Sequence, residues 1–223
     1  RFRSRTMAEI SAEAKGLAES GVKELILVAQ DVTRYGVDLY NSPKLVELLR
    51  NLSQTEGIRR IRLLYCYPEQ IDEALIKEIA SNPKIVKYLD IPLQHVHNEI
   101  LKSMNRRSTF EGICELFKSL RDEIPDISIR STFICGFPGE QTKHFLTLKR
   151  FIEKQKLQNV GFFAYSPEEG TVAALMEERI SEKVTQHRLQ KLAKCQQKVV
   201  KILNKRHVGK TYEVLIDEFC ELE

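Results

Sequence analysis

Apolar residues along the chain alternate between short runs and longer stretches in which they recur every three or four positions. A short apolar run is typical of a buried strand, and the wider spacing is typical of a helix with one buried face. Their repeated alternation predicts βα units, in which helices connect parallel strands. The sequence therefore predicts five parallel strands, over residues 24–29, 60–65, 86–91, 127–135 and 160–165.

Helices are predicted between these strands and after them. Thr6 and Glu9 fit a capping box, and the helix that they begin should end at Ser20 and Gly21. The other predicted helices cover residues 44–52, 72–80, 97–104, 109–121, 143–154 and 182–206. This order favours an α/β fold whose strands form a partial or complete parallel barrel.

The chain of 223 residues is of ordinary length for one α/β domain. We expect the barrel over residues 1–180, a connecting helix over 181–208, and the start of a truncated β domain over 209–223. Within that last range, apolar and polar residues alternate over 211–216 as they do in a strand, although the chain provides no strand for this segment to pair with.

The composition is that of a globular protein, with 42% hydrophobic and 30% charged residues. No apolar run approaches the roughly 18 residues of a membrane helix, so we expect no membrane contact and a cytoplasmic location. The net charge of +4 is too small to indicate a nucleic-acid partner. A basic face between Lys191 and Lys210 is usually a solvated helix surface, and contact with ribosomal RNA is the alternative.

The cysteines lie far apart and are odd in number, so their spacing fits neither a disulfide framework nor a metal motif. We expect buried or incidental thiols, and no metal ligand, at Cys66, Cys114, Cys135, Cys195 and Cys220. His95 and His97 are one residue apart on a predicted turn and lack a third ligand. Helix capping or solvent exposure is the expectation for both histidines.

Loops that follow the carboxyl ends of parallel strands converge on one rim of a barrel, where ligands bind. The loops that should meet there carry polar groups beside Gly or Pro, and they cover residues 30–36, 66–69, 92–95, 136–140 and 166–171.

The most specific of these segments runs from Arg130 to Glu140. Its glycines would let the backbone approach a flat ligand such as adenine, and Glu140 could cap the next helix or bind a polar group. A tight βα turn with a capping carboxylate is the plainer interpretation. Gln94 could bind ribose hydroxyls or only satisfy neighbouring backbone groups.

Asp31 and Arg130 would suit the two ends of an amino-acid zwitterion. The carboxylate of Asp31 could accept from an ammonium group, and the guanidinium of Arg130 could bind a carboxylate. A salt bridge between neighbouring strands is the equally plausible structural role of such residues.

Several of these segments together resemble one family, the radical S-adenosylmethionine (SAM) methylthiotransferases. The resemblance covers essentially the whole chain, and it rests on RFRSR at 1–5, LVAQD at 27–31, YG at 35–36, YLDIPLQH at 88–95, GFPGE at 136–140 and YSP at 165–167. One branch of the family modifies an aspartate of the small-subunit ribosomal protein S-twelve (the RimO type), and another modifies isopentenyl-adenosine of tRNA (the MiaB type). QDVT at 30–33 and the acidic 166–171 segment look like the ribosomal-protein branch.

The resemblance implies SAM and two 4Fe–4S clusters in the full-length protein, with no cluster bound by this chain, because the sequence has no CxxxCxxC motif. It implies that the first barrel strand, the cluster loop, an N-terminal domain and most of a C-terminal TRAM domain are missing, so the chain alone should be inactive and holds no catalytic residue. The expected partner is ribosomal protein S-twelve, and the expected state is a monomer. The cofactor-facing positions would be Gln30, Asp31, Gln94, Arg130, Thr132, Gly136, Phe137, Tyr165 and Ser166.

Two interpretations from other classes remain open. An aldolase-type or phosphate-binding barrel would need a Schiff-base lysine or a late glycine-rich loop, and neither is evident. A noncatalytic RNA-binding module would use the basic C-terminal face and would show strongly salt-dependent binding.

Overall fold

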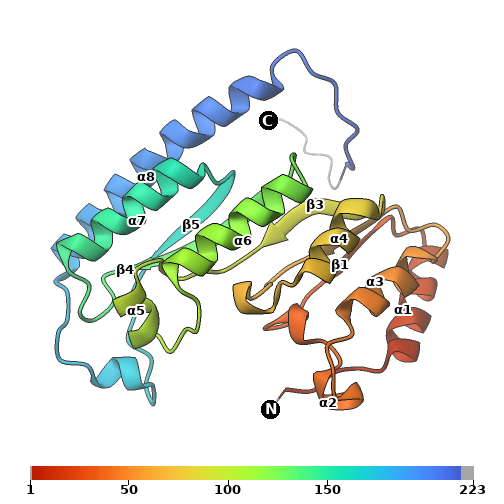
Figure 1. Ribbon diagram of the computed structural model, residues 1–223, viewed down its shortest axis with the longest axis horizontal. Coiled ribbons are helices and arrows are strands. Elements are labelled where there is room, and N and C mark those ends of the chain that lie inside the picture. Colours follow the sequence, from red (N-terminus) through yellow and green to blue (C-terminus); the bar gives the residue numbers. More distant parts are fainter. Residues whose placement is uncertain (1, 217–223) are drawn as a thin grey trace, which may run out of the picture.

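The computed structural model describes residues 2–216, which form an α/β fold around one parallel sheet (Figure 1). The five strands lie side by side in chain order, and each neighbouring pair is parallel. The prediction of five parallel neighbours is therefore confirmed. The strands are β1 (Glu24–Leu27), β2 (Arg60–Leu63), β3 (Ile85–Asp90), β4 (Ser128–Cys135) and β5 (Asn159–Ala164).

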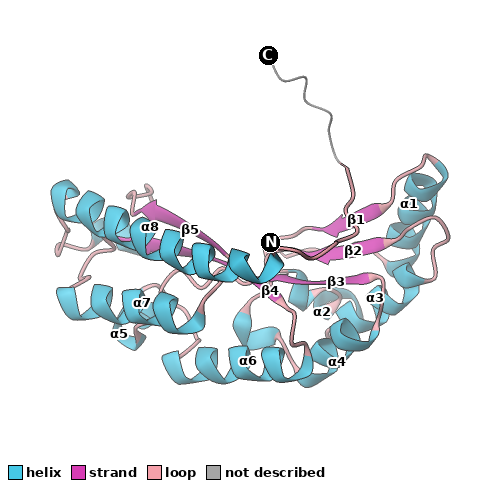
Figure 2. Ribbon diagram, turned by 90° about the horizontal axis from the view of Figure 1, so that it is seen from above, coloured by secondary structure: helices cyan, strands magenta, loops and turns pink. Residues whose placement is uncertain are grey.

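Helices cover one face of the sheet and leave the other face open (Figure 2). The capping box predicted at Thr6 is present, since its hydroxyl accepts from the Glu9 N–H and the Glu9 carboxylate accepts from the Thr6 N–H. The helices are α1 (Met7–Glu19), α2 (Val37–Tyr40), α3 (Leu45–Ser53), α4 (Glu73–Ser81), α5 (Asn98–Ser103), α6 (Phe110–Glu123), α7 (Thr142–Gln155) and α8 (Glu182–Asn204).

Side chains of β4 show how the two faces differ. Burial alternates strictly along this strand, with Ile129 and Phe133 fully buried and Arg130 and Thr132 only partly so. Alternate residues of a strand point to opposite faces, so the buried set packs on the helices and the other set faces the open side. The ring of Phe133 meets Phe151 of α7 with centroids 6.3 Å apart. The core thus lies between sheet and helices, and the sheet forms an open half-barrel.

Residues 211–216, which alternate like a strand in the sequence, form no strand in the structure. The segment has no regular secondary structure. Arg60 Nη2 donates to the Glu213 carbonyl at 3.3 Å, and Leu215 lies beside residues of β1 and β2. A strand is stabilised by a ladder of backbone bonds to a neighbour, and the described chain offers none there. Residues 217–223, which include Cys220, lie outside the described residues. No helix between residues 2 and 216 is long and apolar enough to cross a membrane.

Candidate functional site

Two buried carboxylates lie at the carboxyl ends of β1 and β3. Asp31 is 8% exposed and begins a 3₁₀ turn, where its Oδ1 accepts from the Thr33 N–H at 3.1 Å. Asp90 is 1% exposed, and its Oδ2 accepts from the Tyr65 N–H at 3.3 Å. The second oxygen of each carboxylate is buried without a hydrogen-bond partner in the described chain. Buried polar groups are normally satisfied, and Asp90 has an ion pair with Arg130 in place of a hydrogen bond.

Arg130 pairs with Asp90 and not with Asp31. The two residues are opposite one another across the β3–β4 pair, and Arg130 Nη1 lies 3.4 Å from Asp90 Oδ1. This distance gives an ion pair without hydrogen-bond geometry, which explains why the same oxygen lacks a hydrogen bond. The structure therefore places Arg130 in a salt bridge between neighbouring strands, while a zwitterion site at Asp31 and Arg130 stays a prediction.

Cys66 lies beside these carboxylates, and its amide donates to the Asp90 carbonyl at 2.8 Å. Burial raises the pKa of the Cys66 thiol, and the nearby charges of Asp31 and Asp90 raise it further. Burial also raises the pKa of Cys135 to about 12 and that of Cys195 to about 11. These cysteines are therefore thiols at neutral pH in the chain without a metal. A metal deprotonates the thiols that it binds, so the absence of cluster binding by these cysteines stays a prediction from their spacing.

The open face carries a row of charged and aromatic side chains. Arg62 pairs with Glu24 at 2.6 Å, and its guanidinium carbon lies 4.9 Å from the centre of the Tyr88 ring. Arg130 lies on β4, two strands away from Arg62 on β2. Closed barrels fill this space with branched apolar residues. Here the face is mixed, with exposed Ile26, Val28 and Phe163 beside the charged residues, and it can contact water or a ligand.

A cavity of about 630 Å³ opens at the carboxyl ends of β4 and β5. Sites for small molecules commonly measure about 300–1,000 Å³. Its lining includes five of the nine predicted cofactor residues, namely Gln94, Thr132, Phe137, Tyr165 and Ser166. The structure thus brings together residues that are far apart in sequence.

Gln94 lines this cavity, and its own backbone is in a strained conformation. Its φ is +67°, in the left-handed region that residues other than glycine rarely adopt. Backbone bonds hold it there, because its N–H donates to the Thr132 carbonyl at 2.9 Å and its carbonyl accepts from the Ile134 N–H at 2.8 Å. Its side-chain amide has no hydrogen-bond partner among residues 2–216. Strain of this kind is concentrated at functional sites.

Two aromatic rings close one side of the cavity. Phe137 and Tyr165 meet edge to face with ring centroids 5.3 Å apart. The Tyr165 hydroxyl is buried and has no hydrogen-bond partner in the described part of the chain. An apolar wall that carries an unsatisfied hydroxyl would suit a flat ligand with polar edges.

The turn after β4 is fixed by α8. Gly136 has a φ of +77°, and its N–H donates to Glu140 Oε2 at 2.9 Å. A Cβ at this position would overlap the Thr185 hydroxyl and would lie 2.8 Å from Thr185 Cγ2. The space beside Gly136 on that side is therefore occupied by α8 and not by a flat ligand. The glycine is required by its φ and by this close approach.

Glu140 does not cap the helix that follows it, contrary to one sequence-based expectation. The N-cap of α7 is Gln141, whereas Glu140 is 1% exposed and pairs with Arg188 of α8. Arg188 Nη1 also donates to the Glu140 carbonyl at 2.8 Å. No local pattern marks Arg188 or Thr185 in the sequence, because they reach this turn only through the tertiary fold.

The remaining predicted positions lie away from this cavity. Asp31 lines a separate cavity of about 320 Å³ together with residues 2–5, Ile26 and Val28. Gln30 is exposed and lines neither cavity. Arg130 lies on the open face, where it pairs with Asp90. The nine positions are therefore spread along the rim and the open face.

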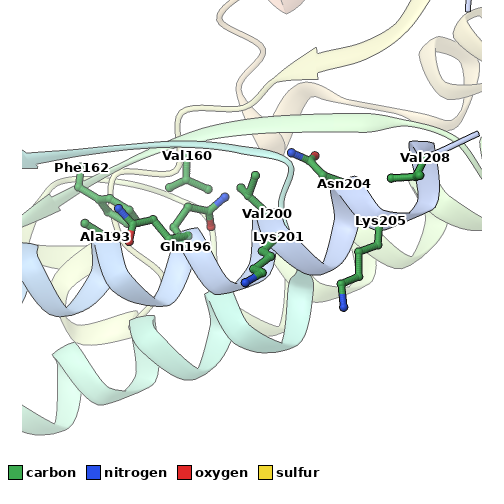
Figure 3. Close-up of a pocket in the computed structure, with 10 residues that line it drawn as sticks. Val160, Phe162, Ala193, Gln196, Val200, Lys201, Asn204, Lys205 and Val208 are labelled. Atoms are coloured by element: carbon green, nitrogen blue, oxygen red, sulfur yellow. The ribbon is translucent and has the colours of Figure 1, made fainter.

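A shallow groove of about 700 Å³ lies between β5 and α8, away from the rim (Figure 3). Val160 and Phe162 form one side, and Ala193, Gln196 and Val200 contribute to the other. Although it is larger than the rim cavity, it holds no carboxylate, histidine or cysteine that could act on a ligand. We therefore place the candidate site at the rim.

His97, Glu99 and His144 form a cluster whose nitrogen and oxygen atoms lie within 4.8 Å of one another. The structure thus supplies the third ligand that the sequence lacked. Both histidines, however, accept a backbone N–H at Nδ1, from Glu99 and Gln141. A histidine that binds a metal donates its other ring N–H, so these rings have the opposite tautomer. The Lys143 ammonium also contacts Glu99 at 2.9 Å, and a helix-capping role fits better.

His97 caps α5 as expected, but His95 is not exposed. His95 is fully buried, its Nδ1 accepts from the His97 N–H at 3.0 Å, and its Nε2 has no hydrogen-bond partner in the described chain. Burial lowers the pKa of His95 to about 3, and the nearby positive groups of His144, His97 and Arg188 lower it further.

Comparison with known protein families decides the class of this fold. The family model described as "Radical SAM superfamily" matches residues 1–152. The chain belongs to the radical SAM superfamily.

Sequence relatives give a narrower comparison within the radical SAM enzymes. The chain is 49% identical over 217 residues to "Ribosomal protein uS12 methylthiotransferase RimO" of Clostridium botulinum (strain Hall), covering 97% of the chain and 49% of that protein. It is 50% identical over 219 residues to the protein of the same name from Clostridium perfringens, covering 98% of the chain and 49% of that protein. The chain therefore spans about half the length of the relatives that it matches.

Solved structures confirm the radical SAM fold. Coproporphyrinogen III oxidase (HemN) from Escherichia coli superposes with a TM-score of 0.59 at 15% identity, over 89% of this chain and 48% of that one. Methylornithine synthase (PylB) superposes with a TM-score of 0.58 at 17% identity, over 88% of this chain and 55% of that one. The expected partial parallel barrel is thus confirmed as the fold of this radical SAM chain.

Proposed function

We propose that this chain is the barrel portion of a radical SAM methylthiotransferase that adds a methylthio group to an aspartate of ribosomal protein uS12. The observation that carries the proposal is the rim cavity, which unites Gln94, Thr132, Phe137, Tyr165 and Ser166. The relatives of nearly 50% identity support the same activity. A tRNA substrate is the alternative, and an exposed acidic loop at the cavity argues against it.

SAM fits the polar groups that the chain leaves unsatisfied. The side-chain amide of Gln94 would bind ribose hydroxyls, and the hydroxyl of Tyr165 would bind a polar edge of the cofactor. Arg130, two residues before Thr132 on the same face of β4, would bind the carboxylate in place of its long contact with Asp90. Asp31 lines a separate cavity, so it is not part of this proposed SAM site. Phe137 and Ile134 would keep water from the reacting end.

When bound, SAM and a 4Fe–4S cluster supply a 5′-deoxyadenosyl radical by reductive cleavage. We propose that the two clusters are held outside these 223 residues, because the sequence has no CxxxCxxC motif. The task of this chain is then to bind and orient the cofactor. The whole protein would work as a cytoplasmic monomer, and the basic face of α8 is available for contact with rRNA.

The domain organisation follows from the same proposal, with the barrel over residues 1–180 and a TRAM-type domain beginning at residue 209. The segment over 181–208 contains α8, which packs on β5 and on α7. Since Arg188 and Thr185 also fix the turn after β4, α8 supports the rim in addition to connecting the two domains.

Affinity for SAM tests the proposal. In the whole, cluster-loaded protein under anaerobic conditions, Arg130→Ala and Gln94→Ala should each weaken SAM binding. For Arg130, loss of a charge-assisted hydrogen bond costs about 1.5–3 kcal/mol, or roughly ten- to a hundredfold in affinity. For the neutral amide of Gln94 the loss is about 0.5–1.5 kcal/mol, or roughly two- to tenfold. Lys198→Ala on the exposed side of α8 is the control and should bind SAM as the wild type does. Unchanged affinity in both rim variants would refute the assignment.

A further inference from the structure

Two large apolar side chains project from the segment that follows β5, residues 166–180. Val172 is 77% exposed and Leu175 is 84% exposed, and both lie on the 3₁₀ turn Val172–Leu175. Single exposed apolar residues are common on protein surfaces. A pair on one turn, at the mouth of a ligand cavity, is a feature of interaction sites.

The turn is held in place by its own hydrogen bonds and by a contact with the rim. The Thr171 hydroxyl accepts from the Ala174 N–H at 3.3 Å, and Arg179 donates to the Ala174 carbonyl at 3.2 Å. The Gly139 N–H donates to the Glu178 carbonyl at 2.9 Å, which ties the segment to the turn after β4. Apolar groups presented from an ordered turn lose less entropy on binding than groups on a flexible loop.

The same segment is acidic. Its exposed carboxylates belong to Glu168, Glu169, Glu177 and Glu178, and none of them has an ion-pair partner within residues 2–216. Arg179 is the one cation in the segment. An acidic surface of this kind attracts cationic partners and repels nucleic-acid phosphates.

The segment also forms one wall of the rim cavity. Glu168, Thr171 and Val172 line it together with Gln94 and Tyr165. Met104, Asn105 and Arg106 form the opposite wall, and the guanidinium of Arg106 lies over the Tyr67 ring at 4.7 Å without a described carboxylate partner. The cavity thus has one acidic wall and one cationic wall.

We propose that residues 166–180 are the docking surface for the substrate protein, and that they select a basic segment in which an apolar residue lies beside the reacting carboxylate. Leu175 and Val172 contact the apolar residue, and the four glutamates contact flanking lysines or arginines. The reacting carboxylate enters the cavity toward Arg106. This inference rests on the proposed function, because it assumes a protein substrate.

Peptide binding by the full chain tests the proposal. The probe is a fluorescein-labelled synthetic peptide with one aspartate between two leucines, flanked on both sides by lysines. A second peptide has glutamates in place of the lysines, and a single-stranded RNA oligonucleotide is the third probe. Fluorescence anisotropy at low and high salt gives each dissociation constant.

The wild type should bind the lysine peptide more tightly than the other two probes, and binding should weaken with salt. The double variant Glu169→Lys/Glu177→Lys should weaken it about tenfold, since two attractions become repulsions. Leu175→Ser should weaken peptide binding about tenfold with little change in salt dependence, because the substitution removes apolar area that the peptide would bury.

Matched controls place the same changes elsewhere on the surface. Glu56→Lys/Glu115→Lys changes the net charge equally, and Ile202→Ser removes an apolar side chain that is 53% exposed on α8. Both should bind the peptide as the wild type does. The proposal is wrong if the controls weaken binding as much as the test variants, if the test variants bind normally, or if RNA binds more tightly than the peptide. SAM affinity of the same proteins reports on the proposed function separately.

Discussion

Arg188 of α8 binds both the main-chain carbonyl and the side-chain carboxylate of Glu140 at the rim. The guanidinium donates to the Glu140 carbonyl at 2.8 Å and pairs with its carboxylate at 2.5 Å. The side chains of Arg188 and Glu140 are 9% and 0% exposed. Since the same carboxylate accepts from the Gly136 N–H, the last helix determines the shape of the turn after β4.

Removing the arginine should therefore leave a buried, unpaired carboxylate. We expect Arg188→Met to lower the free energy of unfolding by about 3–5 kcal/mol, the cost of breaking one side of a buried pair. Urea denaturation measures it, and Lys194→Met at an exposed position of α8 is the control. In the double variant with Glu140→Gln, the loss should be smaller than the sum of the single losses. Additive losses would show that the two side chains do not act as a pair.

Gly136 should tolerate no side chain. Gly136→Ala places a residue with Cβ at a φ of +77° and directs that carbon into Thr185. Left-handed backbone alone costs roughly 1–2 kcal/mol, and the overlap adds to this loss.

Thermal unfolding of Gly136→Ala beside Gly136→Ala/Thr185→Ala separates the two causes. Because the second change removes the Thr185 hydroxyl and methyl group, the double variant should recover part of the lost stability. It should not recover all of it, because the backbone strain remains. No recovery at all would mean that Thr185 does not limit the space beside Gly136.

His95 should make stability depend on pH in a defined window. Its pKa is lowered to about 3 in the folded chain by burial, while in the unfolded chain it should be near its usual value of about 6.5. The unfolded state therefore takes up a proton below that pH and the folded state does not, so stability falls as the pH is lowered toward 3. The loss is about 1.4 kcal/mol per pH unit, or roughly 2 kcal/mol at pH 5.

The variant His95→Asn should lack this component, because asparagine can accept from the His97 N–H without titrating. Urea unfolding of both proteins at pH 7 and pH 5 measures how much unfolding free energy each loses between the two pH values. Comparing the two losses removes the contribution of the other titrating groups, which both proteins share. Equal losses in wild type and variant would show that His95 is accessible to protons in the folded state.

The buried thiols should resist alkylation. Burial raises the pKa of Cys66 and Cys135, and thiols react as thiolates. In the native protein at pH 8, iodoacetamide should modify neither residue, and both should react once denaturant is added. Mass spectrometry of tryptic peptides identifies the modified sites. Rapid native alkylation of either cysteine would contradict the burial seen here.

The order of the elements could be predicted because each strand and helix has its own local period, as the six-residue strand at Ile85–Asp90 and the capping box at Thr6 show. Long-range contacts could not be predicted in this way. Arg188 lies 48 positions from Glu140, and nothing near either residue specifies the other. His95 is fully buried, so the expectation of helix capping or solvent exposure is wrong for this residue. Its neighbours His144 and Arg188 are far from it in the sequence, so no local pattern predicts the burial.

The open sheet has a mechanical consequence. In a closed barrel, a ring of backbone hydrogen bonds fixes the separation of all strands. In the described chain β1 and β5 are not bonded to each other, so the span between them depends on how the outer helices pack. The Phe110 and Phe117 rings of α6 contact Phe151 of α7 and join the two helices in this outer layer. We therefore expect substitutions in this outer layer to change the width of the open face, although its phenylalanines do not line the rim cavity.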